Sequence, residues 1–401
     1  MKKALALVLS LAMMVALLAG CGGSTSSSDS KGSESSGNKV IKVGVFQPST
    51  GDNGAGGKQE ILGTVYAHSL TNTIELGGET YDIELVHADN QSSTEKAVTA
   101  AQTLVNAGCS VVVGSYGSGV SIAGGPVFEA AKIPAIGCGC TNPAVTLNND
   151  FYFRICFLDP FQGYVMSSFA QEEFGAKSAY VLTMLGEDYG SGLGTYFAQA
   201  FEEAGGTVVS ESFPEGNSDF SAYIQNAVNS GADVIFAPSA TTYAALIIAQ
   251  AESMGLKIPL LAGDTWESPV ILEAQKGTSQ QVYCSTFFDE NDDGSVAAEF
   301  VKGFKEWVNA DAQRKTDNGG TDIVAAVTAL GFDAYNTAIE AMKIADSPDP
   351  LAIREALFKV DLDAVTGNIT INEIGDANKN TAYVKRANNG AFEFVKVQTV
   401  E

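Results

Sequence analysis

Basic residues and histidines are scarce in this sequence, and their scarcity argues against several functions. The 401 residues include 23 Lys and Arg against 47 Asp and Glu, which gives a formal net charge of −24. Nucleic-acid binding depends on clustered Lys and Arg, so the composition disfavours a nucleic-acid partner. Only His68 and His87 could supply an imidazole, and neither lies in a loop at the end of a predicted strand. A Ser-His-Asp hydrolase therefore has no obvious base.

Known catalytic fingerprints are missing as well. The sequence has no GxSxG nucleophile elbow, no HExxH zinc motif, no Walker phosphate loop and no GxGxxG after a predicted strand. The stretch "GSYGSG", residues 114–119, has its glycines at the wrong spacing for a dinucleotide loop. We therefore predict a protein that is not an enzyme and needs neither a cofactor nor a metal.

Cysteine is also rare, and its spacing fits no zinc ribbon or zinc finger. After Cys21 the cysteines are Cys109, Cys138, Cys140, Cys156 and Cys284. A bond between Cys138 and Cys140 would be strained, because alternate residues of a strand cannot close a disulfide of good geometry. We interpret these cysteines mainly as small buried hydrophobic side chains. One long-range disulfide, such as Cys156 with Cys284, stays open.

After the N-terminal segment, no apolar run is long enough to span a bilayer. The N-terminus itself begins with the basic pair Lys2-Lys3, continues with the apolar stretch 4–18 and ends in Leu18-Ala19-Gly20-Cys21. This order predicts a signal peptide over residues 1–20. The tetrapeptide resembles a bacterial lipobox, which implies that Cys21 becomes the lipidated N-terminus.

Residues 21–39 are mostly Ser and Gly with a few charges, and such a composition predicts a flexible tether. We therefore expect the protein to be secreted and held by its lipid at the extracytoplasmic face of the cell membrane.

From Val40 onward, short β-branched runs alternate with longer Ala-rich stretches of helical periodicity. In a first block the predicted strands are 40–46, 81–88, 109–115 and 133–137, with helices at 92–107 and 119–131. In a second block the strands are 176–185, 207–213, 232–239 and 258–264, with helices at 190–204, 219–230 and 240–255. Strands that alternate with helices indicate βαβ units and a parallel sheet, so each block predicts one doubly wound lobe.

The predicted fold is therefore α/β, with two Rossmann-like lobes joined by three hinge crossings. The crossings are expected at 151–157, 280–288 and 366–372, two helices at 295–310 and 321–343, and a β-hairpin with an Asn-Asn-Gly turn at 382–397. Lobe 1 would comprise 40–157 and 289–366, and lobe 2 would comprise 158–288 and 367–401.

Candidate ligand-binding residues follow the predicted strands, because open parallel sheets bind ligands beyond the carboxyl ends of their strands. Ser118, Thr141 and the backbone amides from Gly117 onward could hold a carboxylate. Asp264 could hold an ammonium, and Trp266 offers a large apolar face. Simpler roles stay open for each: Ser118, Thr141 and Asp264 could cap helices, and Trp266 could belong to the core.

Five motifs surround these residues and recur in one known family: "VVVGSYGSGVS", "AAKIPAIGCGCTNPAVT", "FYFRICFLDPFQG", "LGEDYGSGL" and "SMGLKIPLLAGDTWES". Through them the chain resembles the substrate-binding lipoproteins of ABC transporters for branched-chain (Leu/Ile/Val-type) amino acids. The resemblance covers roughly residues 40–400 and implies the type 1 periplasmic binding fold.

The resemblance implies roles for individual residues. The carboxylate-binding serine and threonine of the family fall on Ser118 and Thr141, and the acidic partner of the ligand ammonium falls on Asp264. A carbonyl at Gly139 or Cys140 would accept from the ammonium, and the cleft tyrosine falls on Tyr189, for which simple packing is the alternative.

Two loops depart from the family pattern and leave the ligand's side chain open. Glycines in "STGDNGAGGKQ", 49–59, stand where many members carry a tyrosine. Ala240-Thr241 stands where leucine-type members carry aromatic residues, which makes Thr241 a further candidate contact.

The resulting hypothesis is a monomeric binding protein. It would close its lobes on an amino acid, most simply a hydrophobic one, and deliver it to the permease and ATPase subunits of an ABC importer. Three alternatives remain: a ligand sensor of the same fold, an importer subunit for a short amide or other small polar solute, and a cell-surface enzyme.

Overall fold

The computed structural model describes residues 38–291 and 294–399. The predicted signal peptide, most of the predicted tether and the predicted lipidation site Cys21 lie outside these residues. Within them, no helix combines the length and the apolar character that a membrane span requires.

The first sheet has six strands in the order β2-β3-β1-β4-β5-β6. Their bounds are β1 Lys39–Gln47, β2 Thr73–Leu76, β3 Glu79–Asp89, β4 Val111–Val113, β5 Ala135–Gly137 and β6 Tyr152–Arg154. All neighbours pair in parallel except β2, which runs antiparallel to β3. Strand β2 was not predicted from the sequence, although Gly77 and Gly78, both at positive φ, make the tight turn that a two-residue hairpin requires.

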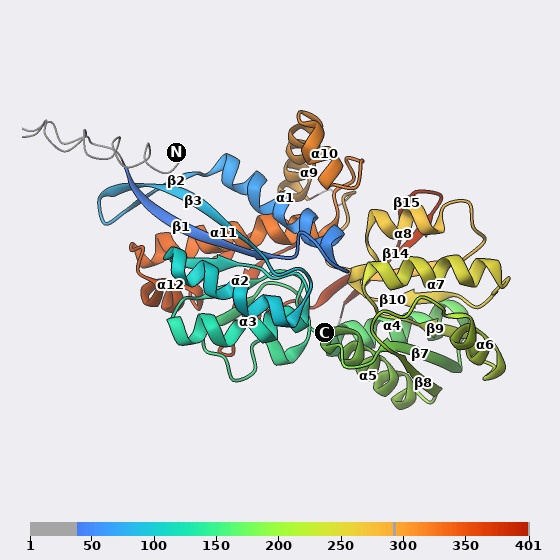
Figure 1. Ribbon diagram of the computed structural model, residues 1–401. Helices are drawn as coiled ribbons and strands as arrows, with labels where there is room; N and C mark the ends of the chain where they lie inside the picture. The colour runs from blue at the N-terminus through green and yellow to red at the C-terminus, as the bar shows by residue number, and fades with distance from the viewer. Residues whose placement is uncertain (1–37, 292–293, 400–401) are drawn as a thin grey trace, which may run out of the picture. The chain divides into compact units, whose positions relative to one another are not determined.

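The helices of this first lobe come from two distant parts of the chain (Figure 1). They are α1 Gly54–Leu70, α2 Thr94–Ala107, α3 Ser118–Ala131, α9 Ser295–Asn309, α10 Ala312–Asp317, α11 Ala326–Ala345 and α12 Pro350–Leu357. Helices α1 and α11 cross closely because glycines stand at the crossing. A Cβ on Gly63 would lie 1.9 Å from the carbonyl oxygen of Thr328, and one on Gly331 would lie 2.1 Å from that of Glu60.

The second sheet has seven strands in the order β15-β14-β11-β10-β9-β7-β8. Their bounds are β7 Ser178–Met184, β8 Thr207–Phe213, β9 Val234–Phe236, β10 Leu260–Ala262, β11 Val282–Thr286, β14 Thr381–Asn388 and β15 Ala391–Thr399. The five strands β7 to β11 pair in parallel, and the hairpin β14–β15 adds antiparallel strands at one edge. Asn389 and Gly390 turn this predicted hairpin at positive φ.

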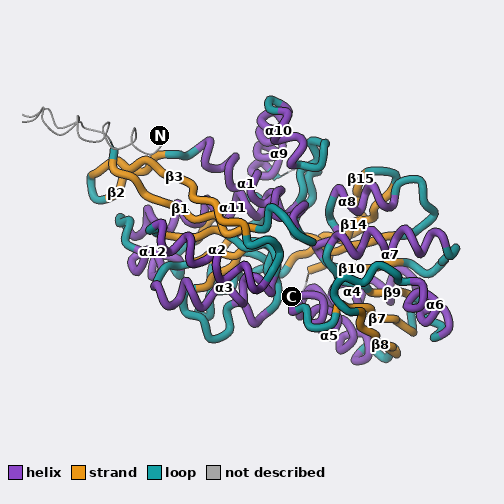
Figure 2. The backbone as a smooth tube through the Cα atoms, in the orientation of Figure 1, coloured by secondary structure: helices purple, strands orange, loops and turns teal. Residues whose placement is uncertain are grey.

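The helices of the second lobe are α4 Asp159–Phe174, α5 Asp188–Glu203, α6 Ser221–Asn229, α7 Thr241–Ser253 and α8 Pro269–Gln275. Helix α8 packs against β14 and α7, as Figure 2 shows, and α4 packs against α5.

The chain passes between the two lobes three times. It leaves the first sheet after β6, returns from β11 to α9, and crosses again after the small hairpin of β12, Asp361–Leu362, and β13, Ile369–Thr370. A buried ion pair joins the first and third passages, with Arg154 Nε 2.6 Å from Asp376 Oδ1. The predicted fold class, two doubly wound lobes joined by three crossings, is confirmed; the residue boundaries assigned to the lobes remain a prediction.

All five described cysteines are buried free thiols, as the interpretation of them as small core residues predicts. The alternative of a bond between Cys156 and Cys284 is wrong. Cys156 packs in the largest hydrophobic cluster, whereas Cys284 on β11 belongs to the cluster under the second sheet.

Candidate functional site

A cavity of about 480 Å³ lies between the carboxyl ends of strands from both sheets. Residues from the first lobe that line it include Asp52, Asn53, Ser92, Tyr116, Gly117, Ser118 and Gly139. Those from the second lobe include Met184, Glu187, Asp188, Tyr189, Glu215, Ala240 and Thr265. The lining from two lobes makes this cavity the candidate site, because parallel sheets present their strand-end loops here.

The first-lobe wall is built on the N-terminus of α3. Gly117 precedes the helix with φ +103°, a left-handed conformation that favours glycine, and its N–H donates to the carbonyl of Gly139 over 2.8 Å. Ser118, the first residue of α3, is 1 % exposed, and its hydroxyl accepts from the N–H of Asn142 over 3.1 Å. The exposed amides and dipole of this helix end favour an anion such as a carboxylate.

Thr141 lies beside this wall, in the loop after β5. Its side chain is 1 % exposed and is not part of the cavity lining. Its hydroxyl lies against the buried carboxyl of Asp159: burial raises the pKa of that carboxyl, and the contact with Thr141 lowers it.

The second-lobe wall carries Asp264 at the end of β10. This carboxylate is 2 % exposed, and its Oδ1 accepts from the hydroxyl of Tyr189 and from Nε2 of Gln162, each over 2.9 Å. Burial raises the pKa of Asp264 from 3.8 to about 6, so the group is mostly ionised at pH 7. A buried carboxylate with only neutral donors attracts a cation.

Gly263 allows Tyr189 to reach this position. A Cβ at residue 263 would lie 2.3 Å from the Tyr189 hydroxyl, and therefore the tyrosine could not approach Asp264 beside any larger residue.

The structure brings several of the predicted site residues together. Gly117, Ser118, Gly139 and Tyr189 line the cavity directly, and Asp264 stands behind Tyr189 and next to the lining residue Thr265. These residues meet because each follows a strand at the same edge of its sheet.

Three other predicted residues are placed differently. Trp266, expected to offer an apolar face to the ligand, is fully buried in the core of the second lobe, as its alternative interpretation stated. It follows Asp264 by two residues on a 3₁₀ turn, so the two side chains point in different directions. The carbonyl of Cys140 accepts from Arg154 Nη1 over 2.8 Å, and Thr241 binds the other lobe rather than lining the cavity.

Glu60, which was not predicted from the sequence, supports the cavity wall behind Gly139. It lies on α1, fully buried; one oxygen accepts from the N–H of Gly139 over 2.8 Å and the other from Nε2 of Gln47 over 2.7 Å. Burial raises the pKa of Glu60 to about 8, so the carboxyl is mainly protonated at pH 7. No motif marks a single glutamate within a helix, so only the structure identifies it.

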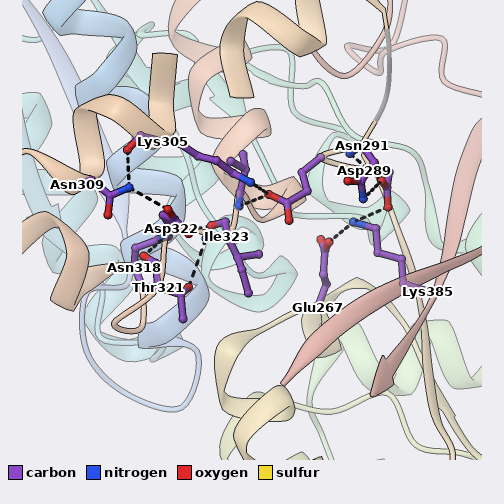
Figure 3. Close-up of polar contacts among 12 residues, drawn as sticks. Glu267, Asp289, Asn291, Lys305, Asn309, Asn318, Thr321, Asp322, Ile323 and Lys385 are labelled. Atoms are coloured by element: carbon purple, nitrogen blue, oxygen red, sulfur yellow. Dashed lines mark hydrogen bonds and ion pairs between the residues drawn. The ribbon is translucent and has the colours of Figure 1, made fainter. Parts of the chain in front are cut away.

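A buried ion cluster connects the Asp264 loop with the crossings (Figure 3). Lys385 Nζ on β14 lies 2.5 Å from Glu267 Oε1 and 3.3 Å from Asp289 Oδ2. The other oxygen of Glu267 accepts from the N–H of Ala326, at the start of α11, over 3.0 Å. Glu267 thus joins the second-lobe wall to a first-lobe helix.

Two hydrogen bonds hold the lobes together at the cavity. Asn142 Nδ2 donates to the carbonyl of Asp188 over 2.8 Å, and the Thr241 hydroxyl donates to the carbonyl of Asp52 over 3.0 Å. The described conformation is therefore one in which the lobes touch across the site.

Two doubly wound lobes that enclose a polar cavity, with an anion-favouring helix end in one wall and a buried carboxylate behind the other, define a two-lobed binding protein. Comparison with known sequences agrees. The model of the periplasmic binding protein family matches residues 40–391, and the chain belongs to this family. Because the family consists of binding proteins, this membership agrees with the prediction that the chain is not an enzyme.

The resemblance to branched-chain amino acid binding proteins is confirmed as well. The solved leucine binding protein LivK from Thermotoga maritima is 32% identical, with a TM-score of 0.82 over 90% of this chain and 99% of that chain. The Streptococcus pneumoniae LivJ protein, solved in complex with isoleucine, is 26% identical, with a TM-score of 0.78 over 90% and 99%. A Leu/Ile/Val-binding protein homolog 2 from Brucella abortus is 28% identical over 340 residues, 84% of this chain and 87% of its own length.

Proposed function

We propose that this chain is the substrate-binding subunit of an ABC importer and that it binds an α-amino acid between its lobes. The observation that carries the proposal is the make-up of the two walls of one cavity. The N-terminus of α3 with Ser118 lines one wall and favours a carboxylate. Tyr189 and Thr265 line the other wall, and the buried carboxylate of Asp264 directly behind Tyr189 favours an ammonium.

A zwitterion is the ligand that satisfies both sides. A simple carboxylic acid would leave the buried Asp264 without a cation, and a simple amine would leave the α3 amides without an anion. Either mismatch costs on the order of 1–3 kcal/mol, because a buried polar group would lose water without gaining a partner. Only a ligand that carries both charges avoids the two losses together.

Binding would be coupled to closure of the lobes. A ligand that contacts Ser118 and Tyr189 simultaneously interacts best when the lobes touch, and it therefore stabilises that conformation. The bonds from Asn142 to Asp188 and from Thr241 to Asp52 form in the same conformation. The closed protein would then present its ligand to a permease, which works with an ATPase subunit.

The names of the relatives make leucine, isoleucine and valine the first amino acids to examine. We further propose that the protein acts as a monomer on the extracytoplasmic side, anchored through lipid on Cys21. Labelling cells with a radioactive fatty acid tests the anchor: wild type should incorporate label, and Cys21→Ala should not.

The test of the ligand class is a thermal-shift screen against the standard amino acids, short amides and sugars. A ligand at a thousandfold excess over its Kd should stabilise the protein by roughly 4 kcal/mol. The best amino acid is then compared with the amine that lacks its carboxylate and the acid that lacks its ammonium. Loss of binding with both analogues is expected, and equal binding of either one would contradict the zwitterion site.

A further inference from the structure

The lining of the cavity indicates what kind of side chain the ligand carries. This inference rests on the proposed amino acid function. Lobe 1 supplies Asp52 and Asn53 there, from the loop between β1 and α1, and lobe 2 supplies Asp188, Glu215 and Ala240. These five side chains are polar, acidic or small. The larger apolar or aromatic side chains of the lining are Tyr116, Val120, Met184, Leu185 and Tyr189, a minority of its residues, whereas a branched aliphatic ligand would need predominantly apolar walls.

The charge of this lining has one sign. None of the described residues that line the cavity is a lysine or an arginine, whereas carboxylates reach it from both lobes. Asp52 of lobe 1 and Glu215 of lobe 2 both act on Tyr243, where burial and then these two carboxylates raise the pKa of the phenol. An acidic ligand side chain would meet this negative potential without a counter-charge, whereas a neutral polar or cationic one would not.

A hydrogen-bond acceptor in the same wall lacks a donor. Asn53 Oδ1 is buried, and no group in residues 38–291 or 294–399 donates to it. The backbone N–H of Asn53 donates to the hydroxyl of Ser92 over 3.0 Å. Asn53 stands at the N-cap position of α1, but its side chain makes no capping hydrogen bond. Asn53 Nδ2 would lie 3.9 Å from a Cβ on Gly117, which places this amide beside the carboxylate wall.

We infer that the side chain of the bound amino acid is polar and carries a hydrogen-bond donor, neutral or cationic, that reaches Asn53 Oδ1. Hydroxyl, amide, amine and guanidinium groups satisfy this requirement. Valine and leucine do not, because they would bury Asn53 Oδ1 against a methyl group and leave it unpaired. Aspartate has the right size but brings a second negative charge to an acidic wall.

Isosteric amino acids separate these possibilities in one experiment. Threonine matches valine in shape, and asparagine matches leucine and aspartate, so differences in Kd report polarity rather than size. Titration calorimetry at pH 7.5 on the purified protein should find threonine at least about tenfold tighter than valine, and asparagine about tenfold tighter than leucine. The Kd of aspartate should exceed that of asparagine by a larger factor than this tenfold.

The variant Asn53→Leu tests the residue that carries the inference. It should reduce the preference for asparagine over leucine to less than about threefold, because the unpaired acceptor is removed. Asn106→Leu is the matched control, since Asn106 is exposed on α2 and does not line the cavity, and it should keep the wild-type ratio. The melting temperature of each variant shows whether it is folded.

Each result decides a different claim. Valine and leucine that bind as tightly as their polar isosteres, or an unchanged ratio in Asn53→Leu, would overturn the inference while leaving an amino acid site. Failure of every amino acid to bind would overturn the proposed function instead.

Discussion

The hydroxyl of Tyr189 donates to Oδ1 of Asp264 over 2.9 Å, and this bond links two second-lobe side chains of the proposed amino acid site. Gln162 donates to the same oxygen, so two neutral donors fix the rotation of the carboxylate. Because neither donor carries charge, Asp264 remains a buried anion that a cation can neutralise. The charge, orientation and titration of this carboxylate each affect how an amino acid should bind.

Replacing Asp264 by asparagine should weaken amino acid binding by about 30- to 100-fold. The substitution keeps the size of the side chain but removes the charge, and hydrogen bonds to charged groups contribute roughly 1.5–3 kcal/mol. Titration calorimetry with the best amino acid measures the loss. Asp188→Asn, at the same cavity, is the matched control and should change Kd by less than about threefold. Equal losses in both variants would assign the effect to overall negative potential rather than to a contact with Asp264.

The variant Tyr189→Phe should weaken binding by about five- to tenfold. It keeps the ring but removes one hydrogen bond to Asp264, which is worth roughly 1 kcal/mol. The remaining bond from Gln162 still holds the carboxylate, so the loss should be smaller than for Asp264→Asn. An affinity equal to wild type would show that Gln162 alone orients the group.

Affinity should fall as the pH drops through the pKa of Asp264. Burial raises this pKa to about 6 in the free protein, and only the ionised carboxylate pairs with an ammonium. Above pH 7 the Kd should therefore be nearly constant, and below pH 6 it should rise about tenfold per pH unit, which corresponds to uptake of one proton. Calorimetry at pH 7.5, 6.5 and 5.5 gives the slope, and Asp264→Asn should remove it.

Glu60 should make the folded protein less stable as the pH rises. Its pKa is near 4.5 when unfolded and about 8 when folded, so folding binds a proton between these values. The native state binds more protons than the unfolded state, and stability therefore falls from about pH 4.5 to pH 8. Each unit within that window costs up to about 1.4 kcal/mol.

Urea unfolding of wild type and Glu60→Gln at pH 5, 6, 7 and 8 tests this effect. The variant should show a flatter dependence on pH. The amide that replaces the carboxyl faces the donor Gln47 Nε2, but that loss is the same at every pH, so the slope alone is informative. Parallel curves would contradict a protonated Glu60.

The sequence predicted the strand-end loops well because their chemistry is local. Glycine, serine and aspartate directly after β-branched runs place Ser118 at the carboxyl edge of the first sheet and Asp264 at that of the second, whatever the details of packing. Glu60 and Asn53 could not be predicted in the same way. Each is an ordinary polar residue at its place in the sequence, and its role arises from contacts with residues far along the chain.

The placement of Trp266 shows a second limit. Large aromatic residues suit both a ligand cavity and a core, and the sequence favours neither. The direction of a single side chain on the 3₁₀ turn decides between them, and that direction depends on how the turn packs on the second sheet.

Thr241→Val should weaken amino acid binding by about fivefold without touching the ligand. The substitution preserves the shape of the side chain but removes its hydrogen bond to the carbonyl of Asp52 in the other lobe, a loss of roughly 1 kcal/mol from the closed conformation only. Because ligand affinity scales with the population of the closed state, Kd should rise by a similar factor. Thr242→Val is the matched control, since Thr242 is the exposed next residue of α7 and should leave Kd unchanged. Small-angle scattering of the ligand-free proteins provides the independent readout: Thr241→Val should have a larger radius of gyration than Thr242→Val. Equal radii together with equal Kd values would mean that the bond between the lobes does not govern closure.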